Sequence, residues 1–236
     1  FGDVNAATAR VLAAEGCDVV IPRAQGCCGA LSAHNGRPAE AQRFARALIE
    51  TFEQTGVDYV IVNSAGCGST MKEYADLLRN DPDYSSRAAA FSARTRDVVE
   101  FLAEIGPVAP RHELALRVAY HDACHLSNAQ GVRAQPRAVL AAIPGLRVLE
   151  IPDGHLCCGS AGIYNLLQPE AAGQLGDRKA DNIRRVDADV VVTANPGCLM
   201  QIGSALGRQG APMALAHTVT ILDASIRGLD VQEVLR

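Results

Sequence analysis

The sequence contains no tryptophan, only five phenylalanines and five tyrosines, and no run of basic residues. Proteins that bind single-stranded nucleic acid stack bases on aromatic rings, and nucleic-acid binding in general leaves a basic patch. With 22 Lys and Arg against 26 Asp and Glu, the chain carries a net charge of −4. These deficits argue against a nucleic-acid partner.

Long apolar runs are also missing. No stretch approaches the roughly 18 apolar residues of a transmembrane helix, and no cationic start leads into an apolar signal segment. We therefore expect a cytoplasmic protein without a transmembrane segment. The composition, 48% hydrophobic and 20% charged over 236 residues, is typical of one or two globular domains with a substantial core.

Cysteine, in contrast, is abundant, with eight residues. Without an export signal, this number favours metal ligands in a reducing compartment over a secreted disulfide framework. The alternative to metal binding is that the cysteines are simply packed in the core, because free cysteine is among the most buried residue types. Cys17 fits that alternative, since it belongs to a short apolar segment and has no counterpart elsewhere in the chain.

Two cysteines stand side by side twice. The stretch Ile21-Pro22-x4-Cys27-Cys28-Gly29 occurs again, in the second half of the chain, as Ile151-Pro152-x4-Cys157-Cys158-Gly159. Adjacent Cα atoms lie about 3.8 Å apart, which is too close for an ordinary disulfide. Both thiols can reach one metal centre if the backbone turns sharply, and the following glycine permits such a turn. The repetition favours metal or cluster binding.

The whole chain follows this repeat. A shift of 131 in residue number places Pro38 on Pro169 and Cys67 on Cys198, and each half alternates strands with helices. We predict an α/β fold of two pseudo-symmetric lobes from an internal duplication, residues 1–110 and 111–236. Each lobe is expected to hold a small parallel sheet with flanking helices and cysteine loops at the strand carboxyl ends. Strands are predicted at 17–21, 59–62, 116–120, 148–151 and 189–192, and helices at 6–15, 38–54, 69–79, 88–105, from about 136, at 169–185 and after residue 198.

The second half carries four candidate ligands in the pattern Cys124-x32-Cys157-Cys158-x39-Cys198. Four thiolates from three loops suit an iron–sulfur cluster or an all-cysteine zinc site. Zinc sites more often use short Cys-x2-Cys knuckles, which the sequence lacks.

Other residues near these thiols are expected to support the ligands by hydrogen bonding. Gly159 and Gly197 allow backbone N–H groups to approach sulfur. The histidines and the amide assigned the same supporting role are His121, His125, His155 and Asn195, with ligation by one of the three histidines as the alternative.

The first half has only three candidate ligands, Cys27, Cys28 and Cys67. The spacing of the second half places the missing partner shortly before Phe1. Either the first half is a three-thiol remnant or the sequence is cut at its amino end, and we expect the latter.

Four motifs carry a family resemblance: Gln25-Gly-Cys-Cys-Gly-Ala-Leu31, Tyr120-His-Asp-Ala-Cys-His125, the stretch from Leu156 to Pro169, and Ala194-Asn-Pro-Gly-Cys-Leu-Met-Gln201. They resemble the cysteine-rich CCG domain, which occurs in heterodisulfide reductase, anaerobic glycerol-3-phosphate dehydrogenase and lactate-utilisation proteins. The amino-acid sequences of the motifs are most similar to those of the glycolate oxidase iron–sulfur subunits of this family. The resemblance covers essentially the whole chain.

This resemblance implies an electron-transfer subunit that carries an iron–sulfur cluster, of the [4Fe-4S] type. It would relay electrons from flavin-containing oxidase subunits, which oxidise glycolate, to an acceptor such as a quinone. The chain itself would supply no catalytic residue and would lie at the inner membrane only through its complex. Two alternatives remain open: a thiol–disulfide redox subunit like heterodisulfide reductase, and a structural zinc module. Heterodisulfide reductase relatives have a fifth cysteine per site where this sequence has Thr70 and Gln201, which disfavours the first alternative.

Overall fold

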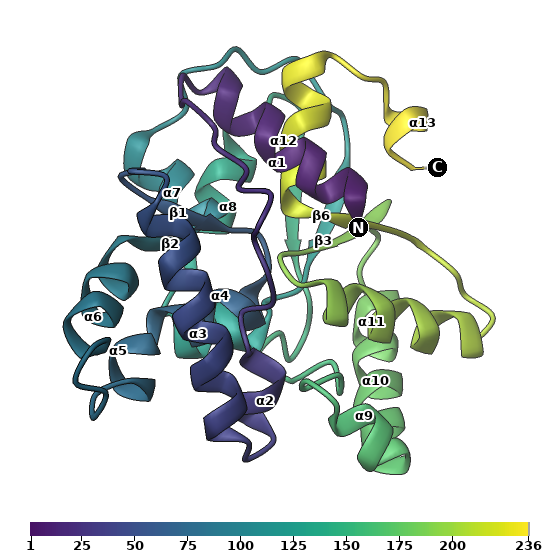
Figure 1. Ribbon diagram of the computed structural model, residues 1–236. Helices are drawn as coiled ribbons and strands as arrows, with labels where there is room; N and C mark the ends of the chain where they lie inside the picture. Colours follow the sequence, from purple (N-terminus) through teal and green to yellow (C-terminus); the bar gives the residue numbers. More distant parts are fainter. Residues whose placement is uncertain (236) are drawn as a thin grey trace.

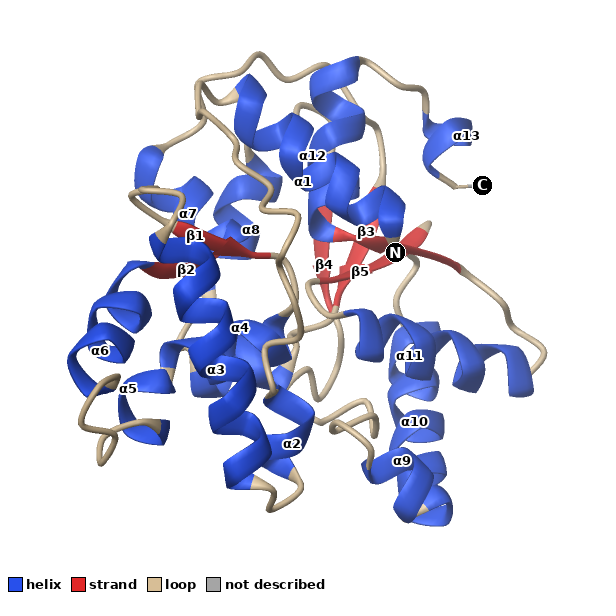
Figure 2. Ribbon diagram, viewed as in Figure 1, coloured by secondary structure: helices blue, strands red, loops and turns tan. Residues whose placement is uncertain are grey.

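The computed structural model describes residues 1–235 and contains two parallel sheets surrounded by helices (Figure 2). The smaller sheet pairs β1 (Val60–Val62) with β2 (Thr95–Asp97). The larger one has the order β4-β3-β5-β6, built from β3 (Arg117–Tyr120), β4 (Arg147–Glu150), β5 (Val190–Thr193) and β6 (Ala214–His217). All paired strands run parallel, so the predicted α/β class is confirmed.

Seven helices belong to the first half: α1 (Gly2–Ala14), α2 (Ala30–His34), α3 (Pro38–Glu53), α4 (Ala65–Lys72), α5 (Tyr74–Leu77), α6 (Ser85–Arg94) and α7 (Val98–Ile105). The described part of the second half has the π-helix η1 (His125–Ala129), α8 (Ala134–Ala141), α9 (Tyr164–Leu167), α10 (Pro169–Arg184), α11 (Pro196–Arg208), α12 (Thr218–Arg227) and α13 (Val231–Val234). None of these helices is long and apolar enough to cross a membrane.

The duplication is visible in matched elements. Helices α3 and α10 each begin with a proline, whose fixed φ and missing N–H suit the first helical position. Strands β1 and β5 each lead into a helix, α4 or α11, that carries a cysteine in its first turn. The two lobes therefore place their cysteine loops at equivalent strand ends.

The lobes meet through two pairs of helices, and α4 of the first lobe also packs on η1 of the second. Helix α1 packs on α12, and α7 packs on α8 (Figure 1). Val4 of α1 and Val98 of α7 are buried in the same core cluster as β3 and β5 of the larger sheet. The smaller sheet has a separate core around Ile49 and Phe91. The first half therefore buries part of its surface against the second. The division into two domains between residues 110 and 111 stays a prediction.

The two central strands of the larger sheet, β3 and β5, are buried on both faces. Val190, Val191 and Val192 of β5 are all inaccessible to solvent, as expected for a parallel strand covered by helices on either side. This packing holds the ends of β3 and β5, and with them two cysteine loops, in fixed positions.

Three sequence predictions were wrong. Residues 69–79 are not one helix, because α4 ends at Lys72 and the separate helix α5 spans Tyr74–Leu77. Residues 17–21 form an extended loop and not a strand, because a strand requires a hydrogen-bonded neighbour and no described strand lies beside this segment. Residues 88–105 are not one helix. Residues 95–97 form β2 beside β1, and Asp97 starts α7 with a capping box to Glu100.

Candidate metal centres

In the second lobe, three loops bring four thiols together at the carboxyl ends of β3, β4 and β5. Cys124 precedes η1, Cys157 and Cys158 follow β4, and Cys198 lies in the first turn of α11. Each thiol in the order Cys124, Cys157, Cys158, Cys198 shifts the pKa of its neighbour, so the four sulfurs lie near one another. None of the four forms a disulfide.

The protons are unequally shared along this row. The neighbouring thiols of Cys124 and Cys158 lower the pKa of Cys157, and the thiol of Cys158 lowers the pKa of Cys198 despite the burial of Cys198. The same contacts, together with burial, raise the pKa values of Cys124 and Cys158. Alternate thiols thus give up their protons readily, which suits ligation because the thiolate is the form that binds a metal.

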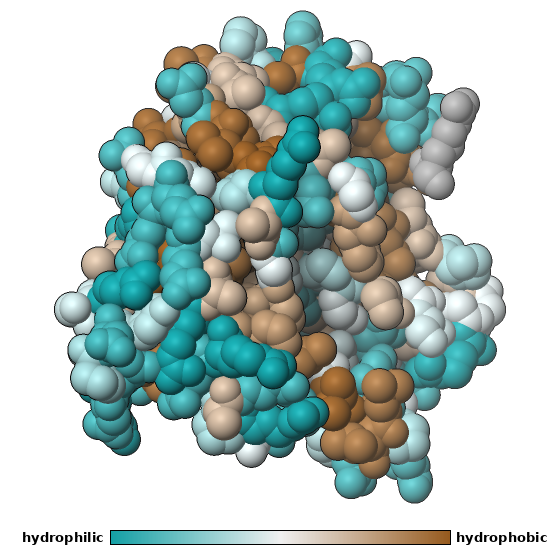
Figure 3. Space-filling model, viewed as in Figure 1, coloured by the Kyte–Doolittle hydropathy of each residue, from teal (hydrophilic) through white to brown (hydrophobic). Residues whose placement is uncertain are grey.

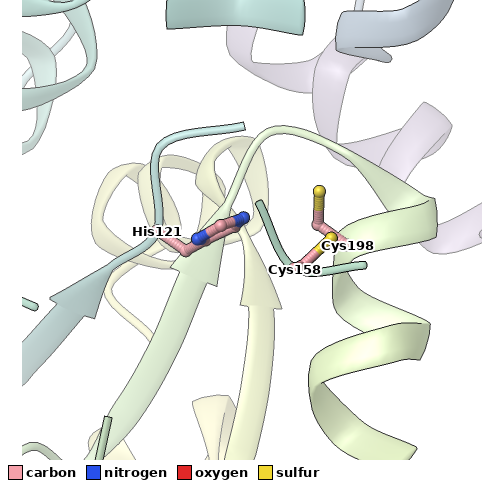
Figure 4. A group of neighbouring side chains, drawn as sticks. All are labelled: His121, Cys158 and Cys198. Atoms are coloured by element: carbon pink, nitrogen blue, oxygen red, sulfur yellow. The ribbon is translucent and has the colours of Figure 1, made fainter. Parts of the chain in front are cut away.

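His121 completes this group (Figure 4). It follows β3 directly, and one of its ring nitrogens lies within 4.8 Å of the sulfurs of Cys158 and Cys198, which are themselves within that distance. The ring is 1% exposed, and neither nitrogen has a hydrogen-bond partner among the described residues. An unpaired buried nitrogen is costly, so the arrangement fits a metal or a cluster sulfur beside the ring.

Polar hydrogens point at two of the four sulfurs. The Gly159 N–H donates to Cys157 Sγ at 3.3 Å, and Asn195 Nδ2 donates to Cys198 Sγ at 3.4 Å. His125 Nδ1 lies 3.7 Å from Cys124 Sγ. Such hydrogen bonds to sulfur tune the potential of a thiolate-bound centre. The supporting role assigned to these residues therefore has a geometric basis.

Glycine is required at position 159, and at position 197 a larger residue would displace the side chain of Ser160. Gly159 has φ +93, and a Cβ there would lie 2.4 Å from the Ala172 carbonyl oxygen. A Cβ on Gly197 would lie 2.8 Å from Ser160 Oγ. His155, by comparison, is exposed, and no hydrogen bond joins it to a described thiol. The supporting role of His155 stays a prediction, and no hydrogen bond to a described thiol supports it.

The first lobe gathers three thiols at the end of β1. Hydrogen bonding from Cys28 lowers the pKa of Cys67 to about 6, and the same contact raises the pKa of Cys28. Cys27 is exposed and accepts a hydrogen bond from the Gly29 N–H at 3.4 Å, the counterpart of the Gly159–Cys157 contact. Cys17 is half-buried beside the main core and shares no hydrogen bond with another described thiol.

The two residues that replace a fifth cysteine are engaged elsewhere. Thr70 Oγ1 lies 3.3 Å from His34 Nε2, and Gln201 Oε1 accepts from Asn165 Nδ2 at 3.3 Å. The shift of 131 in residue number relates both members of these pairs. Each lobe therefore ties this position to the short helix that follows its Cys-Cys-Gly motif, α2 or α9, with a neutral hydrogen bond that provides no further thiolate.

Sequence reasoning missed Lys179, which is fully buried in α10. Its Nζ donates to the carbonyl oxygens of Asp153 and Gly154 at 3.3 and 3.2 Å and so holds the loop before Cys157. Burial lowers the pKa of Lys179, whereas the nearby thiolates oppose that shift. The signal was available, because Lys179 follows Ala172 and Gly176 along the apolar face of the predicted helix.

Apolar side chains are exposed next to these loops. Tyr164, Leu166 and Leu167 of α9, together with Met200 of α11, are largely accessible. The patch over α9 appears as a brown cluster at the lower edge of the space-filling view (Figure 3). It leaves an apolar surface close to the second-lobe thiols.

The motifs and this geometry match a known family. The cysteine-rich CCG domain family matches residues 1–72 and 118–203. The chain belongs to this family. The second match includes β3, whereas the first begins at α1 and contains no counterpart of that strand.

Curated relatives agree with the family assignment. The chain is 40% identical, over 214 residues and 89% of its length, to the probable glycolate oxidase iron-sulfur subunit of Bacillus subtilis (strain 168), of which it covers 48%. It is 32% identical over 228 residues to lactate utilization protein A of Exiguobacterium sp. (strain ATCC BAA-1283 / AT1b), covering 96% of this chain and 93% of that protein. The chain thus spans about half the length of the first relative and nearly all of the second.

Proposed function

We propose that the chain is an iron–sulfur electron-transfer subunit of a complex that oxidises a 2-hydroxy acid, with glycolate as the substrate of that complex. The observation that carries this proposal is the convergence of Cys124, Cys157, Cys158 and Cys198 beside the unpaired ring of His121. The names of the relatives, one a probable glycolate oxidase subunit and others lactate utilization proteins, support the reaction class.

The donor set suits an iron–sulfur cluster, and we assign the [4Fe-4S] type on the count of four thiolates. When bound, such a cluster accepts and donates single electrons. The four cysteines would hold it, while Gly159, Asn195 and His121 would direct N–H groups or a ring nitrogen at its sulfurs. Burial of Cys158 and Cys198 keeps water away from that side of the site.

The partners belong to the same proposal. Hydride or electron-pair removal from a hydroxy acid requires a cofactor such as a flavin, which we place on separate oxidase subunits. The acceptor in this proposal is a quinone at the membrane surface, so that a cytoplasmic chain would lie at the inner membrane through its complex. The exposed leucines of α9, close to the thiols, are a suitable contact surface for such a partner.

The two competing functions predict different chemistry. A structural zinc module would bind one metal ion and no sulfide. Thiol–disulfide reduction of the heterodisulfide type requires the extra thiolate, and the neutral pairs at Thr70 and Gln201 do not provide it. The unpaired imidazole of His121 is compatible with zinc as well as iron, so metal content is the deciding measurement.

The test is anaerobic purification followed by counts of iron, zinc and sulfide, visible absorption and electron paramagnetic resonance. Cys198→Ser should remove most of the iron and the cluster signal, and Cys17→Ser should leave both unchanged. Zinc without iron or sulfide would contradict the proposal. Turnover of glycolate by the isolated chain with an artificial acceptor would contradict the relay role, since no flavin is expected on this chain.

A further inference from the structure

His121 belongs to a row of three polar side chains at the carboxyl edge of the larger sheet. Thr193 of β5 pairs with His217 of β6. The His121 N–H donates to the Val192 carbonyl oxygen, which continues the register of β3 and β5 by one residue and places His121 opposite Thr193. Side chains at paired positions of neighbouring parallel strands point to the same face of the sheet, and the strands lie about 4.8 Å apart. We call His121, Thr193 and His217 the polar row.

The polar row is sealed from solvent. Its three residues are 1%, 0% and 1% exposed. Each keeps a buried polar atom without a hydrogen-bond partner among the described residues, namely both ring nitrogens of His121, Thr193 Oγ1 and His217 Nε2. Buried polar groups are nearly always hydrogen-bonded, because leaving them unpaired costs stability. Unpaired atoms on three adjacent positions indicate that the row bonds within itself, and a buried water can bridge its members.

The far end of the row has a defined proton arrangement. His217 directly precedes α12, and its Nδ1 accepts a hydrogen bond from the Val219 N–H at 3.2 Å. Burial lowers the pKa of His217 to about 4, so the ring is neutral near pH 7. A neutral imidazole has one N–H and one acceptor nitrogen. Because Nδ1 is the acceptor, His217 Nε2 carries the proton and is a donor.

Two backbone carbonyl groups are competing acceptors for this donor. Those of Ala194 and Asn63 oppose the effect of burial on the pKa of His217, so they lie near its ring. The Ala194 carbonyl oxygen already accepts the Ala65 N–H at 3.2 Å, and neither carbonyl forms a hydrogen bond with Nε2 in the described chain. The two arrangements differ in whether the Thr193 hydroxyl affects the thiol site.

The first lobe has the same frame without the row. A shift of 131 in residue number places Val62 on Thr193. Val62 pairs with Asp97 of β2, which accepts a backbone N–H at the start of α7 as His217 does at the start of α12. Valine therefore fits at this strand position, and packing alone does not require threonine. The hydroxyl occurs only in the lobe that has four thiols.

We propose that Thr193 and His217 are positioning residues that fix the tautomer of His121, so that its N–H points at the sulfurs of the second-lobe centre. His217 Nε2–H donates to Thr193 Oγ1, and the Thr193 hydroxyl donates to one ring nitrogen of His121. The other nitrogen carries the proton and faces Cys158 and Cys198 (Figure 4). His121 is thereby a hydrogen-bond donor to sulfur and not a metal ligand. An N–H directed at sulfur stabilises the reduced, more negative form of a centre and raises its reduction potential.

The effect on the potential rests on the proposed function, whereas the tautomer does not. Thr193→Val removes the hydroxyl from a side chain of the same shape, and Thr193→Ser retains the hydroxyl. In redox titrations of the iron-loaded chain, followed by electron paramagnetic resonance, Thr193→Val should shift the potential to a lower value by more than the spread among replicates. Thr193→Ser should keep the parent value. The same potential in all three chains would overturn the proposal, and so would equal shifts in both variants, because packing would then be the cause.

The tautomer is measured separately in the zinc-loaded chain, which is diamagnetic. Nuclear magnetic resonance of chain labelled with ¹⁵N-histidine shows which ring nitrogen carries a proton, and the His121 signals are assigned by their loss in His121→Gln. We expect one neutral tautomer of His121 in the parent and in Thr193→Ser, and both tautomers in Thr193→Val. Coordination of zinc by His121, or one unchanged tautomer in all three chains, would overturn the proposal.

The two proposals can fail separately. Zinc without iron or sulfide in the purified chain would refute the proposed function, and the nitrogen spectra would still decide the tautomer of His121. An iron–sulfur centre with the same potential in Thr193→Val as in the parent would refute the role of the polar row alone.

Discussion

Gly159→Ala tests whether the backbone next to the paired cysteines controls the site. A residue with a Cβ at φ +93 costs about 1–3 kcal/mol. The new Cβ would lie 2.4 Å from the Ala172 carbonyl oxygen, a backbone atom of α10 that cannot rotate away. Overpacking of this kind costs typically about 1–3 kcal/mol. The substitution should therefore lower the free energy of unfolding by about 2–6 kcal/mol.

The assay is urea unfolding of the anaerobic protein, followed by circular dichroism, with iron counted in parallel. Because the Gly159 N–H donates to Cys157 Sγ, displacement of this loop should also lower the iron content. Gly173→Ala is the matched control: it lies in α10, and a Cβ there meets nothing within 4 Å. Alanine should stabilise that position by about 0.5–1 kcal/mol. A loss below about 1 kcal/mol for Gly159→Ala would refute the reasoning.

Three further predictions follow from buried charges. Glu15→Ala should cost about 3–5 kcal/mol in urea unfolding, because the buried guanidinium of Arg111 loses its partner; a loss below about 1 kcal/mol would contradict this. Burial raises the pKa of Asp97 to about 7, so the folded state keeps a proton that the unfolded chain releases near pH 4. Stability should therefore fall by about 1 kcal/mol per pH unit from about pH 4 to 7, and Asp97→Asn should abolish that slope. Lys179→Met removes a buried positive charge and should therefore lower the reduction potential of the proposed second-lobe centre. Leu48→Met, at the equivalent first-lobe position, should leave that potential unchanged. An unchanged potential in Lys179→Met would contradict the assigned charge effect.

Periodicity and motif spacing predicted most of the helices. Pro38 and Pro169 were predicted to begin long helices, and α3 and α10 begin there. These predictions succeeded because a helix is stabilised by contacts close in sequence. The thiol loops were predicted for a similar reason, since the repeated spacing indicated where each strand ends.

Failures arose where distant contacts decide the structure. Residues 17–21 have strand-forming side chains, but the sequence does not reveal whether a neighbouring strand is present. Thr95 to Asp97 form a strand only because β1 lies beside them. The orientation of His121 toward two sulfurs depends on three loops at once. Such features are set by tertiary packing and leave little trace in local patterns.

The helices α1, α7, α8 and α12 pack between the lobes in the pattern of a symmetric dimer interface. Helices α1 and α8 occupy equivalent places in the two halves, as do α7 and α12, and the contacts are α1 with α12 and α8 with α7. This is the reciprocal pattern of an isologous interface, in which each partner presents the same two surfaces to the other. One polypeptide thus contains the interface that a twofold homodimer of half-length chains would form, and the covalent link makes this association independent of protein concentration.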